Sequence, residues 1–233
     1  MNLNTSMLRL DGPTLQRVVV SDVEGTLSAG VTWKGLRRYL ESHGREKEIK
    51  RFIRRRLFLI ALYQLGLINT QRFRENWLKD MLRMFSGLSQ TQFDDVADWV
   101  VENELWPKRR QQVVDQLAEY KAQRHRVLLV SGMVEPMLAR IAAKIGVEAI
   151  GTPLIFKNGA FTGEVISPFI TGENKVLQIK HIVPVDPLLA AFGDTAADIP
   201  MLSLAERPVA VSPDRRLKRW AVSNRCQIIV QTK

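Results

Sequence analysis

Two patterns of hydrophobic positions divide this chain of 233 residues. The first is a short, continuous apolar run followed directly by polar residues or glycine, and it occurs at residues 18–20, 127–130 and 188–192. Such runs are typical of strands that are buried on both faces of a parallel sheet. Shorter runs predict three further strands at residues 147–150, 209–211 and 227–230.

The second pattern is helical spacing, which fills the intervals between these runs. Val113, Leu117 and Tyr120 lie three or four positions apart, which predicts a helix before the second long strand. Asn158-Gly159 predicts the turn of a β-hairpin over residues 154–165. Further helices are predicted at residues 136–145, 174–181, 200–205 and 214–222. Strands that alternate with helices predict an α/β fold with a doubly wound, parallel, Rossmann-like sheet.

The stretch from residue 31 to residue 106 has helical spacing throughout and is too long for a single crossover connection. Thr91 and Asp94 resemble a capping box at the start of one helix in this stretch. We therefore predict an inserted helical cap domain at residues 31–106, lying over the strand ends. The core domain would consist of residues 1–30 and 107–233, with residues 1–16 as a loosely ordered tail.

Reactive side chains follow the first long strand. Asp22 and Glu24 come directly after it, and Gly25 and Thr26 complete the cluster. A carboxylate at this position can attack phosphorus, and a second acid can donate a proton to the leaving oxygen and later activate water. Ligands of open α/β sheets bind outside the carboxyl ends of the strands. The other interpretation of Asp22 is a capping residue at a strand-to-helix turn.

Similar groups follow the other long strands. Ser131 and Gly132 offer a hydroxyl and an open N–H group to a phosphate, although a plain helix cap has the same composition. Asp194 and Asp198 are oxygen ligands of the kind that Mg²⁺ prefers, although Asp198 could instead cap the following helix. Lys175 could neutralise these carboxylates, or it could be a solvated lysine. The combination of these groups on consecutive strand–helix units favours a catalytic site.

These residues carry a family resemblance. The sequence Asp22-Val-Glu-Gly-Thr26, the pair Ser131-Gly132, Lys175, and Asp194 with Asp198 resemble the four motifs of the haloacid dehalogenase-like phosphatases. The run from Phe192 to Leu202 and the helical cap after the first motif are similar to the phosphoserine-phosphatase-like branch. The resemblance covers residues 17–230, although the cap matches only in length and helicity.

The resemblance implies a role for each motif residue. Asp22 would be the nucleophile, Glu24 the general acid and base, and Lys175 the cation that stabilises the transition state. Thr26, Ser131 and the Gly132 N–H would bind the phosphoryl group. Mg²⁺ would lie between Asp22, the backbone carbonyl of Glu24 and Asp194, with Asp198 assisting. The chain would thus be a Mg²⁺-dependent phosphomonoester hydrolase that forms an aspartyl-phosphate.

Two residues depart from the family pattern. Glu24 stands where these phosphatases normally carry an aspartate, so its proton must be delivered from a position one methylene further out. Val31 stands where phosphoserine phosphatases carry the glutamate that holds the substrate ammonium. We therefore expect a main substrate other than phosphoserine. The alternative function is a weakly active or inactive relative that binds an anionic lipid surface or nucleic acid through its cap.

The formal charge of +10 favours acidic partners, and much of it comes from one segment. Residues 34–56 contain ten lysines and arginines against three glutamates, and the apolar stretch 57–68 follows directly. This segment could be a solvated cap face, or it could contact an anionic membrane surface and a lipid phosphomonoester. Nucleic acid is not expected, because interleaved aromatic residues are few.

Cysteine content and hydropathy bear on the compartment. A single cysteine, Cys226, excludes an internal disulfide framework, and three scattered histidines show no metal-ligand spacing. The start of the chain has no signal-peptide pattern, and the apolar stretch 57–68 is too short to span a bilayer. These observations suit a cytoplasmic protein that acts on a small or lipid-attached phosphomonoester. They leave the oligomeric state open.

Overall fold

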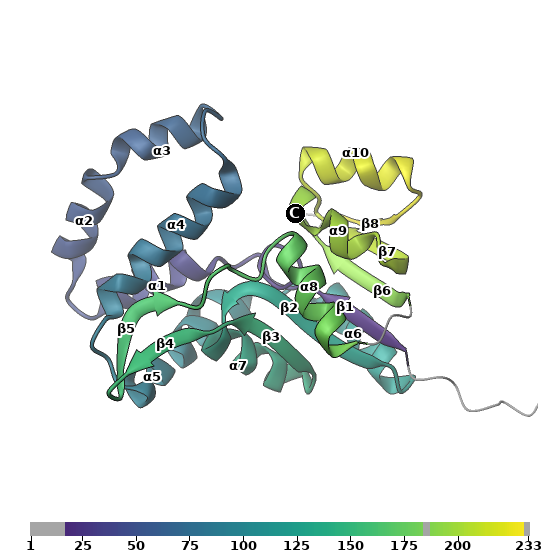
Figure 1. Ribbon diagram of the computed structural model, residues 1–233, viewed down its shortest axis with the longest axis horizontal. Coiled ribbons are helices and arrows are strands. Elements are labelled where there is room, and N and C mark those ends of the chain that lie inside the picture. The colour runs from purple at the N-terminus through teal and green to yellow at the C-terminus, as the bar shows by residue number, and fades with distance from the viewer. Residues whose placement is uncertain (1–16, 184–186, 231–233) are drawn as a thin grey trace, which may run out of the picture.

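A six-stranded parallel sheet with helices on both faces forms the centre of the computed structural model (Figure 1), which describes residues 17–183 and 187–230. The strand order is β3-β2-β1-β6-β7-β8. The strands are β1 (Val18–Ser21), β2 (Arg126–Val134), β3 (Glu148–Thr152), β6 (Leu188–Gly193), β7 (Ala205–Val211) and β8 (Gln227–Ile229). The predicted doubly wound α/β sheet is confirmed. The predicted tail at residues 1–16 lies outside the described residues.

Alternate residues of the central strands pack into two separate hydrophobic layers. Val19 and Leu129 belong to the layer on one face, whereas Val20 and Leu128 belong to the layer on the other. This alternation follows from the two-residue period of a strand, because successive side chains point to opposite faces. The first layer includes α6 (Gln111–Ala122) and α7 (Glu135–Ile145); the second includes α8 (Glu173–Ile182), α9 (Ile199–Leu202) and α10 (Arg215–Ser223).

The strand order reverses at β1, which pairs with β2 on one side and β6 on the other. A doubly wound sheet leaves a crevice at the carboxyl ends of the strands where its order reverses. The topology therefore brings the residues that follow β1, β2 and β6 to one place. These are the three strands after which the sequence carries its reactive residues.

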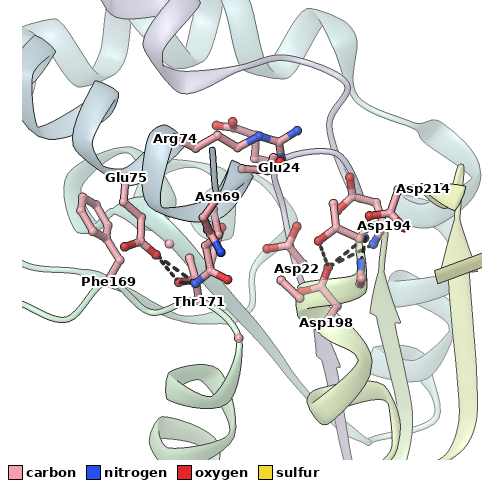
Figure 2. Close-up of a pocket in the computed structure, with 18 of the residues that line it drawn as sticks. Asp22, Glu24, Asn69, Arg74, Glu75, Phe169, Thr171, Asp194, Asp198 and Asp214 are labelled. Carbon is pink, nitrogen blue, oxygen red and sulfur yellow. Dashed lines mark hydrogen bonds between the residues drawn. The ribbon is translucent and has the colours of Figure 1, made fainter. Parts of the chain in front are cut away.

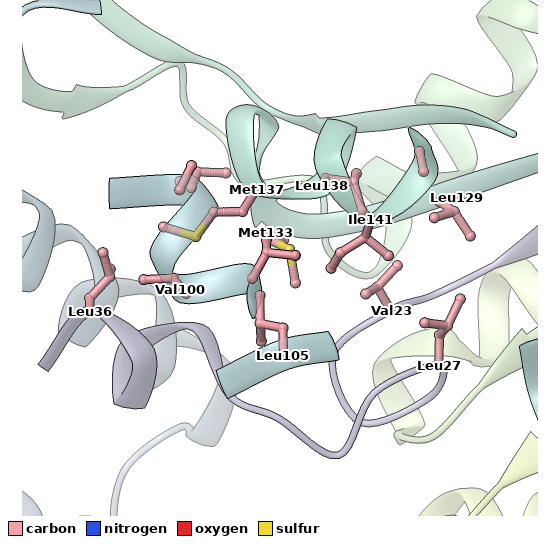
Figure 3. Packing of buried hydrophobic residues seen from close by; sticks show 14 of the residues in the cluster. Val23, Leu27, Leu36, Val100, Leu105, Leu129, Met133, Met137, Leu138 and Ile141 are labelled. Atoms are coloured by element: carbon pink, nitrogen blue, oxygen red, sulfur yellow. The ribbon is translucent and has the colours of Figure 1, made fainter. Parts of the chain in front are cut away.

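Helices fill the segment between β1 and α6, as predicted; we call this segment the helical insertion. Its α-helices are α1 (Thr32–Ser42), α2 (Glu46–Arg54), α3 (Leu57–Gln64), α4 (Thr70–Leu82) and α5 (Gln90–Val100), followed by a π-helical turn (Val101–Leu105) and short 3₁₀ turns. Figure 3 shows Leu36, Val100 and Leu105 of the insertion packed against Met133 and Met137. The insertion thus shares one hydrophobic layer with the sheet, and its separation as a cap domain at 31–106 stays a prediction.

A two-stranded hairpin lies beside the insertion. Its strands are β4 (Leu154–Lys157) and β5 (Ala160–Val165), and Asn158 and Gly159 form the turn with φ of 52° and 77°, as the predicted Asn-Gly turn requires. Phe161 exchanges backbone hydrogen bonds with the segment that joins α4 to α5, since its N–H donates to Leu88 and its carbonyl accepts from Gly87. The hairpin therefore fastens the insertion to the core.

Three local predictions were wrong. The capping box of α5 consists of Ser89 and Gln92 rather than Thr91 and Asp94, because the helix begins at Gln90. Ala205 begins β7 instead of ending a helix. β2 continues through Ser131 and Gly132 to Val134, with an irregular register against β3. None of the helices within the described residues is both long and apolar enough to cross a membrane.

Candidate active site

The carboxyl ends of β1 and β6 place three aspartates together. Asp22 follows β1, Asp194 follows β6, and Asp198 lies in the 3₁₀ turn (Ala196–Asp198) after it. One carboxylate oxygen from each lies within 4.8 Å of the others. Figure 2 shows this cluster at one side of a cavity. The sequence prediction that these three residues come together is confirmed by the geometry.

Lys175 joins this cluster from α8. Its ammonium donates to Oδ1 of Asp22 and to Oδ1 of Asp198, each at 2.6 Å, and its side chain is 4% exposed. Burial by itself lowers the pKa of the Lys175 ammonium, but Asp198 and Asp22 outweigh burial and leave this pKa above the ordinary value. Lys175 is therefore a charged member of the site and not a solvated lysine.

Asp198 is held by hydrogen bonds on both oxygens. Its Oδ2 accepts from the backbone N–H groups of Asp194 and Thr195 and from the Thr195 hydroxyl, while Oδ1 accepts from Lys175. These bonds fix the turn that presents Asp194. These contacts are those of a residue that positions Lys175 and Asp194. The assistance of Asp198 in metal binding stays a prediction.

Asp194 has far fewer partners. Among the described residues, its carboxylate accepts one hydrogen bond, from the Thr26 hydroxyl at 3.4 Å. Burial, together with the charges of Asp22 and Asp198, raises the pKa of Asp194 to about 8. Two buried carboxylates and the half-buried Asp194 face one ammonium, and oxygen donors of this kind suit Mg²⁺. The residues present therefore fit a magnesium ion held by Asp22 and Asp194.

The turn after β1 depends on a glycine and an arginine. Gly25 has a φ of +94°, and a Cβ built there would overlap the Asp194 carboxylate. Arg110, at the start of α6, donates from one guanidinium nitrogen to the carbonyls of Gly25 and Thr26. Sequence reasoning missed Arg110, because it lies 84 residues beyond Thr26 and outside any motif. Arg110 therefore fixes the backbone of this turn from α6.

Glu24 lies beside this cluster and contacts the start of α1. Its Oε2 accepts from the backbone N–H of Thr32 at 2.7 Å. Burial raises the pKa of Glu24 even though the Thr32 hydrogen bonds oppose this. A carboxyl group with a raised pKa retains its proton more readily, which is what a general acid requires. The position and the electrostatics of Glu24 are thus compatible with the predicted acid and base role.

The predicted phosphate-binding groups differ in their access to the main cavity. Ser131 and Gly132 line the main cavity, and a Cβ at Gly132 would overlap the methyl group of Thr171. Thr26 is fully buried, and its hydroxyl lies 3.2 Å from Oδ2 of Asp22. The phosphate contacts predicted for these three residues stay predictions, and Thr26 has the geometry of a residue that orients Asp22.

The main cavity has a volume of about 1000 Å³ and contains groups that sequence reasoning missed. Arg74 and Glu75 enter its wall from α4, and Arg215 and Arg216 from α10. The Glu75 carboxylate accepts from the Thr171 hydroxyl at 2.7 Å (Figure 2). A helical stripe of polar residues at positions 71, 74 and 75 was the available signal.

A second cavity of about 540 Å³ adjoins the first. The residues that line both cavities are Glu24, Thr32, Arg74, Leu78 and Asp194. The rest of the second lining is mainly apolar and aromatic, apart from Lys34, and its large side chains are Val31, Trp33, Ile60, Tyr63, Phe73 and Trp77. An apolar chamber therefore lies directly beside the acidic cluster.

Solved structures with similar folds include phosphatases. A Bordetella pertussis protein of unknown function has a TM-score of 0.77 at 22% identity, covering 92% of this chain and 98% of that one. A phosphoserine phosphatase in its apo form has a TM-score of 0.62 at 19% identity, covering 93% and 94%. These likenesses establish a shared fold.

Two curated relatives from Mycobacterium tuberculosis bear phosphatase names. A protein named phosphoserine phosphatase is 27% identical over 133 residues, and a probable phosphatase is 27% identical over 146 residues. These matches cover 55% and 60% of this chain but 42% and 50% of the relatives. The chain therefore spans about half the length of the curated relatives it matches.

The family model described as haloacid dehalogenase-like hydrolase matches residues 19–203. This range includes Asp22, Lys175 and Asp198, the residues on which the resemblance in sequence depends. The range covers most of the sheet and the residues of the acidic cluster up to Asp198. The chain belongs to the haloacid dehalogenase-like hydrolases.

Proposed function

We propose that this protein is a Mg²⁺-dependent phosphomonoesterase that forms an aspartyl-phosphate on Asp22. The observation that carries the proposal is the cluster of Asp22, Lys175, Asp194 and Asp198 at the reversal of the strand order. Phosphoryl transfer requires a positioned nucleophile and charge neutralisation more than it requires covalent chemistry from the protein. This cluster supplies both.

In the first step, Asp22 attacks phosphorus and the bond to the leaving oxygen breaks. The Lys175 ammonium orients Oδ1 of Asp22, which leaves Oδ2 as the oxygen that faces Thr26. The Glu24 carboxyl group donates its proton to the leaving oxygen, so that an alcohol departs. Mg²⁺ held by Asp22, Asp194 and the Glu24 carbonyl would neutralise charge on the phosphoryl oxygens.

In the second step, the Glu24 carboxylate takes a proton from water, which attacks the phosphorus of the aspartyl-phosphate. Inorganic phosphate leaves and Asp22 is regenerated. Ser131 and the Gly132 N–H, both in the cavity wall, would hold the phosphoryl oxygens during both steps. The presence of every group that the two steps need supports an enzyme over an inactive binding relative.

The substrate is proposed to differ from phosphoserine. Val31 and Trp33 add no negative charge to the second cavity, whose carboxylates are Glu24 and Asp194, both of them used in the proposed chemistry. Glu75 does bring a carboxylate into the main cavity, but this carboxylate already accepts two hydrogen bonds: the Thr171 hydroxyl and the Gln71 amide lie 2.7 and 3.0 Å from its Oε1. Glu75 is thus engaged with Thr171 and Gln71 through Oε1, and the proposal that the substrate lacks an ammonium group rests on Val31.

A phosphate-release screen tests the proposal. The purified protein is incubated with Mg²⁺ and a range of phosphomonoesters, beside the variant Asp22→Asn. We expect turnover that requires Mg²⁺ and is lost in the variant, with phosphoserine among the poorer substrates. The absence of turnover on every ester, or equal turnover by Asp22→Asn, would exclude this mechanism. High efficiency on phosphoserine would exclude the substrate proposal alone.

A further inference from the structure

Helix α3 is apolar on every side, yet its outer face is uncovered. Leu57 and Phe58 at its start are 56% and 74% exposed, and Leu65 and Leu67 in the turn after it are 71% and 68% exposed. A helix that is hydrophobic all round is normally buried. Several large apolar side chains that are exposed at the two ends of one short helix mark a candidate interaction surface. We call Leu57, Phe58, Leu65 and Leu67 the apolar tip.

Unpaired arginines lie next to the apolar tip. Arg51, Arg54 and Arg55, at the end of α2, are exposed and form no salt bridge with any residue that the structure describes. The other arginines of the basic segment form ion pairs within the protein, as Arg38 does with Glu104 and Arg56 with Asp80, each at 2.8 Å. The unpaired arginines of the segment therefore lie next to the start of α3, where Leu57 and Phe58 are exposed.

The apolar tip also borders the mouth of the main cavity. Gly66 and Leu67 line the cavity on the side of the insertion, whereas Arg215 and Arg216 line it on the side of α10. Figure 1 shows α3 and α10 on the same side of the molecule, with the sheet beneath them. Both arginines of α10 are exposed. One face of the protein thus combines an apolar edge, two basic flanks and the entrance to the acidic cluster.

We propose that this face docks on an anionic lipid bilayer and that the enzyme takes a lipid phosphomonoester from it. The apolar tip would insert among the acyl chains at the interface, while the arginines of α2 and α10 contact the anionic headgroups. The cavity mouth then faces the headgroup layer. The docking stands on the surface alone, whereas the lipid substrate rests on the proposed phosphatase function.

The inner face of α3 supports the same class of substrate. Ile60 and Tyr63 line the second cavity together with Phe73 and Trp77. That cavity also contacts Glu24, the group proposed to protonate the leaving oxygen. An apolar chamber at the leaving-group side suits the glycerol and the first acyl carbons of a lipid, whereas a small polar leaving group would leave its aromatic walls without contact.

Charge favours an anionic bilayer over two other possible partners of this face, a second copy of the chain and nucleic acid. A second copy of the chain docked through this tip would bring Arg51, Arg54 and Arg55 of both copies together, and like charges in contact disfavour such a pair. Nucleic acid would satisfy the arginines but would leave Phe58 and Leu65 exposed to water. An anionic bilayer satisfies the arginines and the apolar side chains at the same time.

Vesicle co-sedimentation tests the docking. The full chain is mixed at low salt with vesicles of phosphatidylcholine alone or with about one third phosphatidylglycerol. We expect binding to the anionic vesicles, weakened at high salt, and a partition coefficient at least about tenfold lower for Leu57→Ser/Phe58→Ser, because the inserted apolar area is lost. Arg54→Gln/Arg55→Gln should weaken binding and reduce its salt dependence. Thermal unfolding of each variant reports whether it is folded.

The matched control is Leu177→Ser/Ile182→Ser on α8, where the exposed fractions are 54% and 41%. The docking is overturned if this control loses as much vesicle binding as Leu57→Ser/Phe58→Ser does. It is also overturned if the parent protein does not bind anionic vesicles. A dimer in sedimentation that Leu57→Ser/Phe58→Ser abolishes assigns the tip to a second copy. The parent protein could instead bind an oligonucleotide more tightly than it binds vesicles. If Leu57→Ser/Phe58→Ser leaves this binding unchanged, the arginines are assigned to nucleic acid.

A turnover experiment separates the docking from the chemistry. Phosphate release is measured from phosphatidic acid in phosphatidylcholine vesicles and from soluble p-nitrophenyl phosphate. We expect Leu57→Ser/Phe58→Ser to lose at least about tenfold on the vesicles and to retain its rate on the soluble ester. If the variant Leu57→Ser/Phe58→Ser loses the same fraction of its rate on the vesicles as on the soluble ester, the lipid substrate is overturned. Vesicle binding without turnover of either ester overturns the phosphatase function and leaves the docking intact.

Discussion

The ammonium nitrogen of Lys175 lies 2.6 Å from Oδ1 of Asp22, although the two residues are 153 positions apart in the chain. The same nitrogen lies 2.6 Å from Oδ1 of Asp198. One buried cation therefore connects the ends of β1 and β6 through α8. It holds together carboxylates that would otherwise repel one another, so it contributes to stability as well as to the proposed chemistry.

Replacing this cation should destabilise the metal-free protein. In Lys175→Met, Asp22 and Asp198 remain buried and lose their shared partner. Breaking a buried ion pair from one side costs about 3–5 kcal/mol of unfolding free energy. Urea unfolding in the presence of EDTA measures this loss. Lys180→Met, on the exposed side of the same helix, should change the unfolding free energy by less than about 0.5 kcal/mol. Equal effects of the two substitutions would contradict the role of Lys175.

Glycine at position 25 should be required for the site. In Gly25→Ala, the new Cβ would meet the Asp194 carboxylate at a backbone φ of +94°. We expect Mg²⁺-dependent turnover to fall at least about a hundredfold, because displacement of a reacting group by about 1 Å has this effect. Gly44→Ala is the control, since Gly44 also has a positive φ, of +77°, but a Cβ at this position would meet no atom within 4 Å. Its cost should be limited to about 1 kcal/mol of stability.

Magnesium should stabilise the parent protein and not Asp194→Asn. Binding to the folded state alone raises stability by about 2.7 kcal/mol when the ion is at a hundred times its dissociation constant. The melting temperature is measured with and without Mg²⁺ for both proteins. Without Mg²⁺, Asp194→Asn should melt no lower than the parent, because the substitution removes a carboxyl group whose ionised form is disfavoured by burial and by Asp22 and Asp198, which raise its pKa to about 8. Equal Mg²⁺-induced shifts in the two proteins would exclude Asp194 as a ligand.

The acid role of Glu24 should depend on the leaving group. In Glu24→Gln, esters of aliphatic alcohols should react about a hundredfold or more slowly, because the departing alkoxide then lacks a proton donor. p-Nitrophenyl phosphate should lose much less in its first step, since nitrophenolate leaves without protonation. The ratio of the kcat/KM values for the two esters measures the difference, because kcat/KM reports the steps up to departure of the leaving group and excludes the later hydrolysis of the aspartyl-phosphate, which is common to both esters. A uniform loss on both esters would indicate that Glu24 shapes the site without donating a proton to the leaving group.

Arg110 should support the site without contacting the substrate. Its guanidinium donates to the carbonyls of Gly25 and Thr26, behind the turn that carries the reactive groups. Arg110→Met should therefore lower kcat and leave KM within about twofold, because loss of positioning affects the transition state more than ground-state binding. The conservative variant Arg110→Lys should restore part of the rate. A change confined to KM would instead place Arg110 in substrate binding.

The sequence by itself determined which residues meet at the sheet edge. Apolar runs 18–20, 127–130 and 188–192 predict buried strands, and the polar residues after them must then lie at one edge. Asp22, Asp194 and Asp198 were found in this way, and Lys175 was found from the resemblance to a family. Their proximity follows from the apolar runs, which are local patterns, and from the parallel sheet that alternating strands and helices predict.

Only the tertiary structure decided what surrounds those residues. Arg110 holds the Gly25 turn from another helix, and Arg74 and Glu75 enter the cavity from α4; their polar side chains look like ordinary surface residues in sequence. The basic segment 34–56 also reads as one charge run, whereas ion pairs with distant acids neutralise part of it and leave the free arginines beside the apolar tip. Pairing and exposure depend on contacts between residues far apart in the chain, and local patterns do not encode these contacts.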